Sequence, residues 1–117
     1  MGNIERKNLT SPDETRSFDN GKLDVVKFGK MTLGLGTFNS GWKWSQSVKP
    51  IAKTESCQVH HNMYIISGKM KVVMDDGSSA EFGPGDAGVV PPGHDAWVVG
   101  NEPVVFLDFS GAETYAK

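Results

Sequence analysis

Glycine and proline divide the chain into short apolar runs, and this division constrains the fold more than any other feature. The chain has 117 residues, of which 14 are glycine and 6 are proline. Turn-forming groups such as Asp75-Asp76-Gly77, Gly83–Asp86 and Pro91-Pro92-Gly93 follow one another at the spacing of about 8–12 residues that is typical of sandwiches and barrels. Because no window of a dozen residues carries the apolar stripe of a helix, the sequence predicts an all-β domain.

The runs between these turns have the composition and the periodicity of strands. Met31, Leu33 and Leu35 alternate with a polar residue or glycine, the period of two of a strand with one buried face. The region 39–55 is expected to be irregular. We expect an N-terminal arm at 1–20 with a short helical turn after Ser11, one barrel at 21–112 and a tail at 113–117. The predicted strands are 23–28, 31–38, 57–67, 70–74, 80–82, 87–90, 96–99 and 104–109.

Charge and cysteine content exclude several classes of protein. The formal net charge of −2 argues against nucleic acid or an anionic membrane surface as the main partner. The single cysteine, Cys57, excludes an intramolecular disulfide, so the fold does not depend on an oxidising compartment. Met1–Thr10 is polar, and the chain contains no apolar run long enough for a membrane helix. We therefore expect a cytoplasmic protein.

The glycine and proline positions of the second half follow a known pattern. Gly85, Pro91 and Gly93 have the spacing of the second cupin motif, and Tyr64–Gly68 is similar to the end of the first motif. Roughly residues 40–110 thus resemble the cupins. The resemblance implies a single small β-barrel of the double-stranded β-helix or jelly-roll type, often a homodimer, to which the N-terminal arm could add a strand.

The usual cupin metal ligands are absent from the matching positions. Cupins typically hold one divalent metal with two His and one Glu from the first motif and one His from the second. Counting back from Gly68, the Glu position is His61. The remaining positions hold Thr54 and Ser56, or Glu55 and Cys57 with the shorter motif spacing, and then Ala96 for the second-motif His and Gly100 for its closing Asn. The standard site therefore cannot be transferred to this chain.

All three histidines of the chain nevertheless lie in or beside the two motifs. On one strand Cys57 and His61 share a face, whereas His60 points to the opposite side. If the Glu-like position faces the interior, as the resemblance implies, Cys57 and His61 face inward, and His94 lies near the mouth of the barrel. Thiolate and imidazole suit Zn²⁺ or another borderline metal, so Cys57, His61 and His94 are the candidate ligands of one divalent ion.

Three functions remain open from the sequence, and it does not decide whether the chain is an enzyme. In the first, the barrel binds a small organic ligand without an obligatory metal. In the second, a metal-dependent enzyme of isomerase, oxygenase or cyclase type uses the rearranged ligands. In the third, the chain is a structural or regulatory dimer with a filled barrel. The candidate ligand-binding residues are His61, His94, Trp42, Trp44 and Trp97, of which the tryptophans could equally fill the core or a subunit contact.

Overall fold

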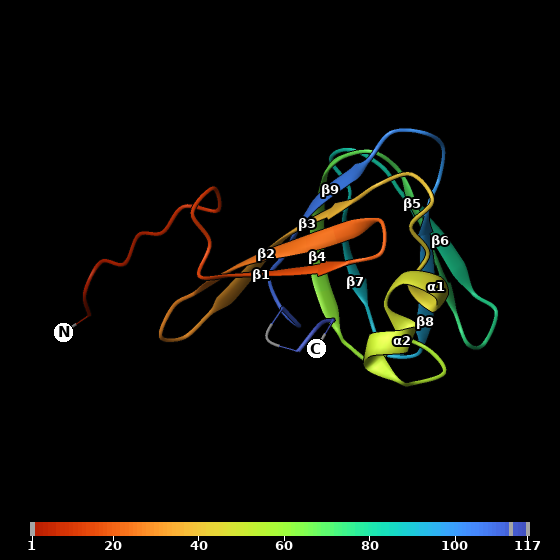
Figure 1. Cartoon of the computed structure of the whole chain (residues 1–117), viewed down its shortest axis with the longest axis horizontal. Helices are drawn as coiled ribbons and strands as arrows, with labels where there is room; N and C mark the ends of the chain where they lie inside the picture. Colours follow the sequence, from red (N-terminus) through yellow and green to blue (C-terminus); the bar gives the residue numbers. More distant parts are fainter. Residues whose placement is uncertain (1, 113, 117) are drawn as a thin grey trace.

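The computed structural model describes residues 2–112 and 114–116. Within these residues the chain forms a β-fold with two short helices (Figure 1). The elements are β1 (Glu14–Phe18), β2 (Gly21–Lys27), β3 (Thr32–Phe38), α1 (Trp44–Ser47), α2 (Lys49–Ala52), β4 (His61–Ser67), β5 (Met70–Met74), β6 (Ser79–Phe82), β7 (Ala87–Val90), β8 (His94–Val98) and β9 (Val104–Asp108).

The strands form two antiparallel sheets that enclose one core. The larger sheet has the order β1-β2-β3-β9-β4-β7, and the smaller sheet has the order β6-β5-β8. The last strand, β9, lies between β3 and β4, so the end of the chain joins its two halves. This arrangement is that of a small jelly roll, which confirms the predicted all-β fold class.

The core is built from the inward-facing residues of both sheets. Along β4, His61, Met63 and Ile65 are buried, whereas the residues between them are exposed. Next to it, β9 shows the same alternation. Phe38 stacks on Trp42 with ring centroids 3.9 Å apart, and both rings are buried. Each large apolar side chain removed from water contributes about 1.5–3 kcal/mol to stability.

Two glycines of the cupin-like pattern have conformations that explain them. Gly68 has a φ of +80°, and a Cβ there would overlap the backbone of Pro103. Gly93 has a φ of +95°, so it turns the chain immediately before His94. At Gly68 and Gly93 any other residue would be strained, and at Gly68 its side chain would also not fit.

Three details of the expected secondary structure are wrong. The segment after Ser11 forms no helical turn, because Glu14–Phe18 is strand β1 and pairs with β2 of the same chain. The region 39–55 contains helices α1 and α2. The expected long strand 57–67 begins only at His61, and Cys57 forms an isolated bridge with His94 instead. For Cys57, the bridge to a segment distant in sequence outweighs the local strand pattern.

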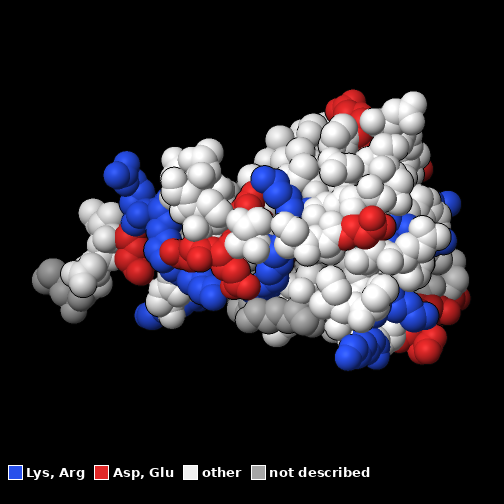
Figure 2. All heavy atoms as spheres, viewed as in Figure 1, with Lys and Arg blue, Asp and Glu red and all other residues white. Residues whose placement is uncertain are grey.

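On the face shown in Figure 2, charged side chains are densest at the N-terminal end of the molecule and more scattered elsewhere. Residues before β1 extend away from the sheets, and Figure 2 shows acidic and basic groups intermingled over this arm and the β1–β2 hairpin. Glu14 lies 3.1 Å from Lys27 and 2.9 Å from Arg16. Among the described residues, no helix is long and apolar enough to cross a membrane. Glu113 and Lys117 of the expected tail lie outside the described residues.

Candidate metal centre

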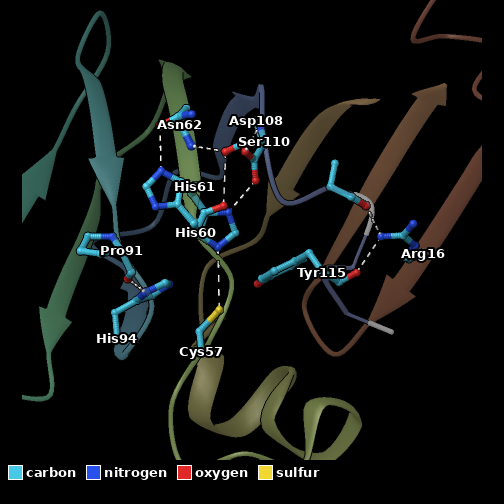
Figure 3. A network of polar contacts seen from close by, with 11 residues as sticks. Arg16, Cys57, His60, His61, Asn62, Pro91, His94, Asp108, Ser110 and Tyr115 are labelled. Atoms are coloured by element: carbon cyan, nitrogen blue, oxygen red, sulfur yellow. Dashed lines mark hydrogen bonds and ion pairs between the residues drawn. The ribbon is translucent and has the colours of Figure 1, made fainter. Parts of the chain in front are cut away.

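Three buried side chains meet between the two sheets. The ligand atoms of Cys57, His61 and His94 all lie within 4.8 Å of one another (Figure 3). The Sγ of Cys57 lies 3.8 Å from Nε2 of His61. The three residues are 2%, 8% and 4% exposed, respectively. The structure therefore brings together the three residues that the sequence indicated as metal ligands.

Backbone pairing places these side chains. His61 is the first residue of β4, and His94 is the first residue of β8. Cys57 is held beside His94 by main-chain hydrogen bonds: its N–H donates to the carbonyl of His94, and Gly93 N–H donates to the carbonyl of Cys57, both at 2.7 Å. The turn formed by Gly93 thus connects the cysteine to the strand of the second histidine.

The orientation of His61 is set by a buried carboxylate. Its Nδ1 lies 2.5 Å from Oδ2 of Asp108, a residue that is 1% exposed. A carboxylate oxygen accepts a hydrogen bond, so Nδ1 carries a proton, and in the neutral ring the lone pair is on Nε2, the atom that faces Cys57. The second oxygen of Asp108 accepts a hydrogen bond from the backbone N–H of Ser110 at 3.0 Å. Asp108 therefore occupies the place of a partner that orients a metal-ligating histidine.

His94 has the same tautomer for a different reason. Its Nδ1 donates to the carbonyl oxygen of Pro91 at 2.8 Å, because a carbonyl can only accept. This leaves the lone pair on Nε2. Burial lowers the pKa of His94 from its ordinary value, so the ring is neutral near pH 7. A neutral imidazole with a free Nε2 is the form that binds a metal ion.

Cys57 is an unreactive thiol until a cation lies beside it. Burial, together with the negative charges of Asp108 and Asp95, raises the pKa of its thiol to about 11. At neutral pH the sulfur is therefore protonated, and the residue is no activated nucleophile. A bound divalent ion reverses this balance, because a coordinating thiol loses its proton.

The space next to the triad is small. A cavity of about 30 Å³ is lined by His61, His94, Trp44 and Tyr115 and by apolar side chains of both sheets. That volume holds about one water molecule. In this conformation the inner cavity has room for a water-sized ligand beside the triad.

Sequence comparison agrees with the fold. The profile of the EutQ-like cupin domain family (Cupin_3) matches residues 20–106. The chain belongs to the cupins. No match was found among curated protein sequences.

Solved structures similar to this cupin show the same fold at low identity. A Rhizobium leguminosarum bv. viciae protein, described as of unknown function, is 19% identical with a TM-score of 0.67, and the match covers 93% of this chain and 97% of that one. An oxalate decarboxylase of Lactobacillus farciminis, as a formate complex, is 20% identical with a TM-score of 0.63; the match covers 87% of this chain and 32% of that one. The Bacillus subtilis oxalate decarboxylase is 24% identical with a TM-score of 0.60, and the match covers 88% of this chain and 28% of that one. The cupin thus spans about a third of either decarboxylase chain.

The candidate ligands of this cupin lie within or beside the two motifs. His61 occupies the Glu position of the first motif, and Cys57 occupies its second His position when the motif has the shorter spacing. His94 lies two residues before Ala96, the second-motif position, and both are buried on one face of β8. Strands β4 and β8 thus each supply one histidine to the candidate site, and Cys57 reaches it from the segment before β4.

The three tryptophans have three different surroundings. Trp44 lines the cavity. Trp42 packs on Phe38 in the core and does not line it. Trp97 lies on the other face of β8 from His94, where Lys43 Nζ is 5.3 Å from its ring centroid. The structure thus brings only one tryptophan to the site.

Two residues of the site were not found from the sequence. The sequence could have indicated Asp108. Val104, Phe106 and Asp108 are alternate residues of β9, so Asp108 shares the buried face, and a buried acid needs a partner. Tyr115 had none, because a residue beyond the last strand has no periodicity that predicts burial. It is 5% exposed, and its ring lies 5.4 Å from that of His61.

Proposed function

We propose that this cupin is a metal-dependent enzyme whose single divalent ion is held by Cys57, His61 and His94. The observation that carries the proposal is the convergence of three buried donor atoms, with both histidines held as Nδ1–H tautomers by Asp108 and Pro91. A structural role alone does not require two imidazoles with free Nε2 atoms beside a thiol. When bound, the ion would supply Lewis-acid chemistry to a substrate oxygen.

The donor types favour zinc. One thiolate and two imidazoles suit Zn²⁺, whereas Mn²⁺ prefers carboxylate, carbonyl and water ligands. A structure of the Bacillus subtilis oxalate decarboxylase is described as having Mn(II) centres. The sulfur of Cys57 therefore argues for a different metal in this cupin. Because Zn²⁺ has no redox chemistry, it favours a reaction of isomerase or cyclase type over an oxygenase.

Three protein ligands leave one coordination position open, as in catalytic zinc sites. The cavity of about 30 Å³ lies against His61 and His94, where a water-sized ligand would fit. Trp44 also lines this cavity, and its indole N–H is buried without a hydrogen-bond partner among the described residues. An oxygen atom bound near Trp44 would satisfy that donor. These features support a site that accepts a further ligand.

Binding of a small organic ligand without metal is the second candidate. An outer pocket of about 170 Å³ is lined by Trp44, Cys57, Gln58 and Tyr115, among others. It adjoins the triad from outside the barrel, and its volume suits a compact organic molecule. The filled barrel is the third candidate, because the inner cavity is nearly occupied by side chains.

Cobalt titration of the untagged, chelator-stripped protein tests the proposal. We expect one Co²⁺ per chain and a sulfur-to-cobalt charge-transfer band. Cys57→Ser should abolish the band, and His61→Ala should abolish tight binding. His60→Ala is the matched control and should bind like the wild type, because His60 is exposed and bonded to Asn62. If the wild type binds no stoichiometric cobalt, or the triad variants bind equally well, the metal proposal is wrong.

A thermal-shift screen of the stripped protein with small acids, sugars and phenolics separates the second candidate. A stabilising compound whose effect persists in excess chelator would favour the metal-free binding module. The metal proposal predicts that any such compound stabilises the protein more after Zn²⁺ or Co²⁺ is restored.

A further inference from the structure

The C-terminal segment brings a phenol to the candidate metal centre. Tyr115 lines both the inner cavity and the outer pocket, so its side chain lies at the boundary between them. In Figure 3 its hydroxyl points towards Cys57 and His61. No hydrogen bond from this hydroxyl is drawn to any of the residues shown there. A tyrosine hydroxyl that faces the triad from the cavity wall can donate a hydrogen bond to a group bound there.

A buried arginine holds this segment in place. Nη1 of Arg16, on β1, donates to the carbonyl of Ala112 at 2.5 Å and to the carbonyl of Tyr115 at 2.8 Å. Arg16 is 8% exposed, and its other nitrogens donate to Glu14 at 2.9 and 3.2 Å. A single guanidinium nitrogen therefore holds two carbonyls of this turn at once, while the other two bind Glu14.

The final turn also packs directly on the start of β4. Gly111 has a φ of +84°, and a Cβ there would overlap the backbone carbonyl of His60. The N–H of Tyr115 donates to the carbonyl of Gly111 at 3.0 Å, which closes the turn. The position of the phenol is thus set from both sides, by β1 and by the residues next to His61.

Both contributors lie outside the part of the chain that matches the family. The EutQ-like cupin domain covers residues 20–106, whereas the segment containing Arg16 precedes it and that containing Tyr115 follows it. The motif positions of the cupins therefore do not account for this contact.

We propose that Tyr115 is the fourth functional group of the site and that Arg16 is its positioning residue. The hydroxyl of Tyr115 donates a hydrogen bond to the small anion or substrate oxygen that occupies the open position beside Cys57, His61 and His94. Arg16 keeps the phenol at the site by holding the backbone of its turn. This inference rests on the proposed metal site and assigns to that site small oxygen-donor or anionic ligands entering from the outer pocket.

Azide binding to the cobalt-loaded protein, followed by visible absorption, tests the role of Tyr115. Tyr115→Phe keeps the ring and removes only the hydroxyl, so we expect one cobalt per chain but roughly tenfold weaker azide binding, the effect of one hydrogen bond to a charged ligand. Tyr64→Phe is the matched control, because Tyr64 is exposed on the outer face of β4, and it should leave azide binding unchanged. Arg16→Gln retains the hydroxyl but releases the turn, and it should weaken azide binding several-fold.

The outcomes separate this inference from the metal proposal. One cobalt per chain in both proteins, with weaker azide binding by Tyr115→Phe than by the wild type, supports both. One cobalt per chain with equal or tighter azide binding by the variant overturns the role of Tyr115 and leaves the metal site intact. Failure of the wild type to bind cobalt overturns both.

Discussion

Two adjacent histidines have opposite surroundings in this cupin. His60 is exposed, and its Nε2 lies 3.2 Å from Oδ1 of Asn62. His61 is buried, and its Nδ1 lies 2.5 Å from Asp108. Because β4 begins at His61, one residue of register decides which imidazole enters the core. Both residues are histidines, so the residue type does not distinguish them. His61 is the candidate ligand because β4 begins there and because Asp108, distant in sequence, lies beside its ring.

The same contrast holds for the two faces of the larger sheet. Its outer face exposes apolar side chains, including Tyr64, Ile66 and Val89, which are 41%, 46% and 66% exposed. Its inner face buries the polar pair His61 and Asp108. This reversal of the usual pattern is informative on both sides, because buried polar groups and exposed apolar ones need a reason. A homodimer stays a prediction, as does binding of a small-molecule partner.

The largest expected effect is the difference between the two histidines. His61→Ala should lower the affinity for Zn²⁺ by more than about a hundredfold, since a residue that binds the ion contributes more than one that only orients such a residue. His60→Ala should leave it unchanged. Competition of each variant with a chromogenic zinc chelator measures both constants. Equal losses in the two variants would mean that the ion binds on the outer face or nonspecifically.

A smaller effect is expected when only the partner of His61 is changed. Asp108→Asn keeps a hydrogen-bond acceptor but removes the charge, and it should weaken zinc binding about tenfold to a hundredfold. Asp24→Asn is the control, because Asp24 is also buried but accepts a hydrogen bond from Thr15, away from the triad. The same chelator competition applies. Zinc affinity unaffected by Asp108→Asn would remove the orienting role assigned to this carboxylate.

The buried thiol makes metal binding dependent on pH. Since the pKa of Cys57 is about 11, the metal-free protein carries the thiol proton at pH 7–9 and must release it when an ion binds. Zinc affinity should therefore rise about tenfold per pH unit in this range. Calorimetry in buffers of different ionisation enthalpy should find one proton released per ion, and Cys57→Ser should release none. Zero release by the wild type would contradict thiolate ligation.

The smallest effect concerns the stability of the metal-free protein in acid. The pKa of His94 is lowered by burial, so below about pH 6.5 the unfolded chain binds a proton that the folded chain does not. Stability should fall as pH drops below that value, by at most about 1.4 kcal/mol per unit, and level off below the folded pKa. Urea unfolding of wild type and His94→Gln between pH 7.5 and 5 measures this, and the variant should show a smaller slope. If the free energy of unfolding falls equally with pH in both proteins, a group other than His94 causes the loss of stability in acid.

The sequence was sufficient for the fold because glycine and proline act locally. Gly68 and Gly93 have positive φ angles that other residues rarely adopt, so their positions in the sequence indicate where strands end in turns. The candidate ligands could also be predicted, although the argument for Cys57 assumed a continuous strand that the structure does not have. Its isolated bridge with His94 places the sulfur at the site by a tertiary contact.

The remainder of the site depends on contacts between distant segments. Arg16 and Tyr115 are about a hundred residues apart in sequence, and their hydrogen bond has no local signature. The segment around Arg16 has the polar sequence of a solvent-exposed one. Its buried guanidinium is satisfied by backbone carbonyls, which leave no pattern in the sequence. Such pairings become visible only when both ends of the chain are placed.

The most direct test of the metal centre is anomalous diffraction at the zinc edge from crystals of the zinc-loaded protein. The account predicts one peak per chain, bonded to Cys57 Sγ at about 2.3 Å and to Nε2 of His61 and His94 at about 2.0–2.1 Å. A zinc peak elsewhere, or an empty triad after loading, would contradict it.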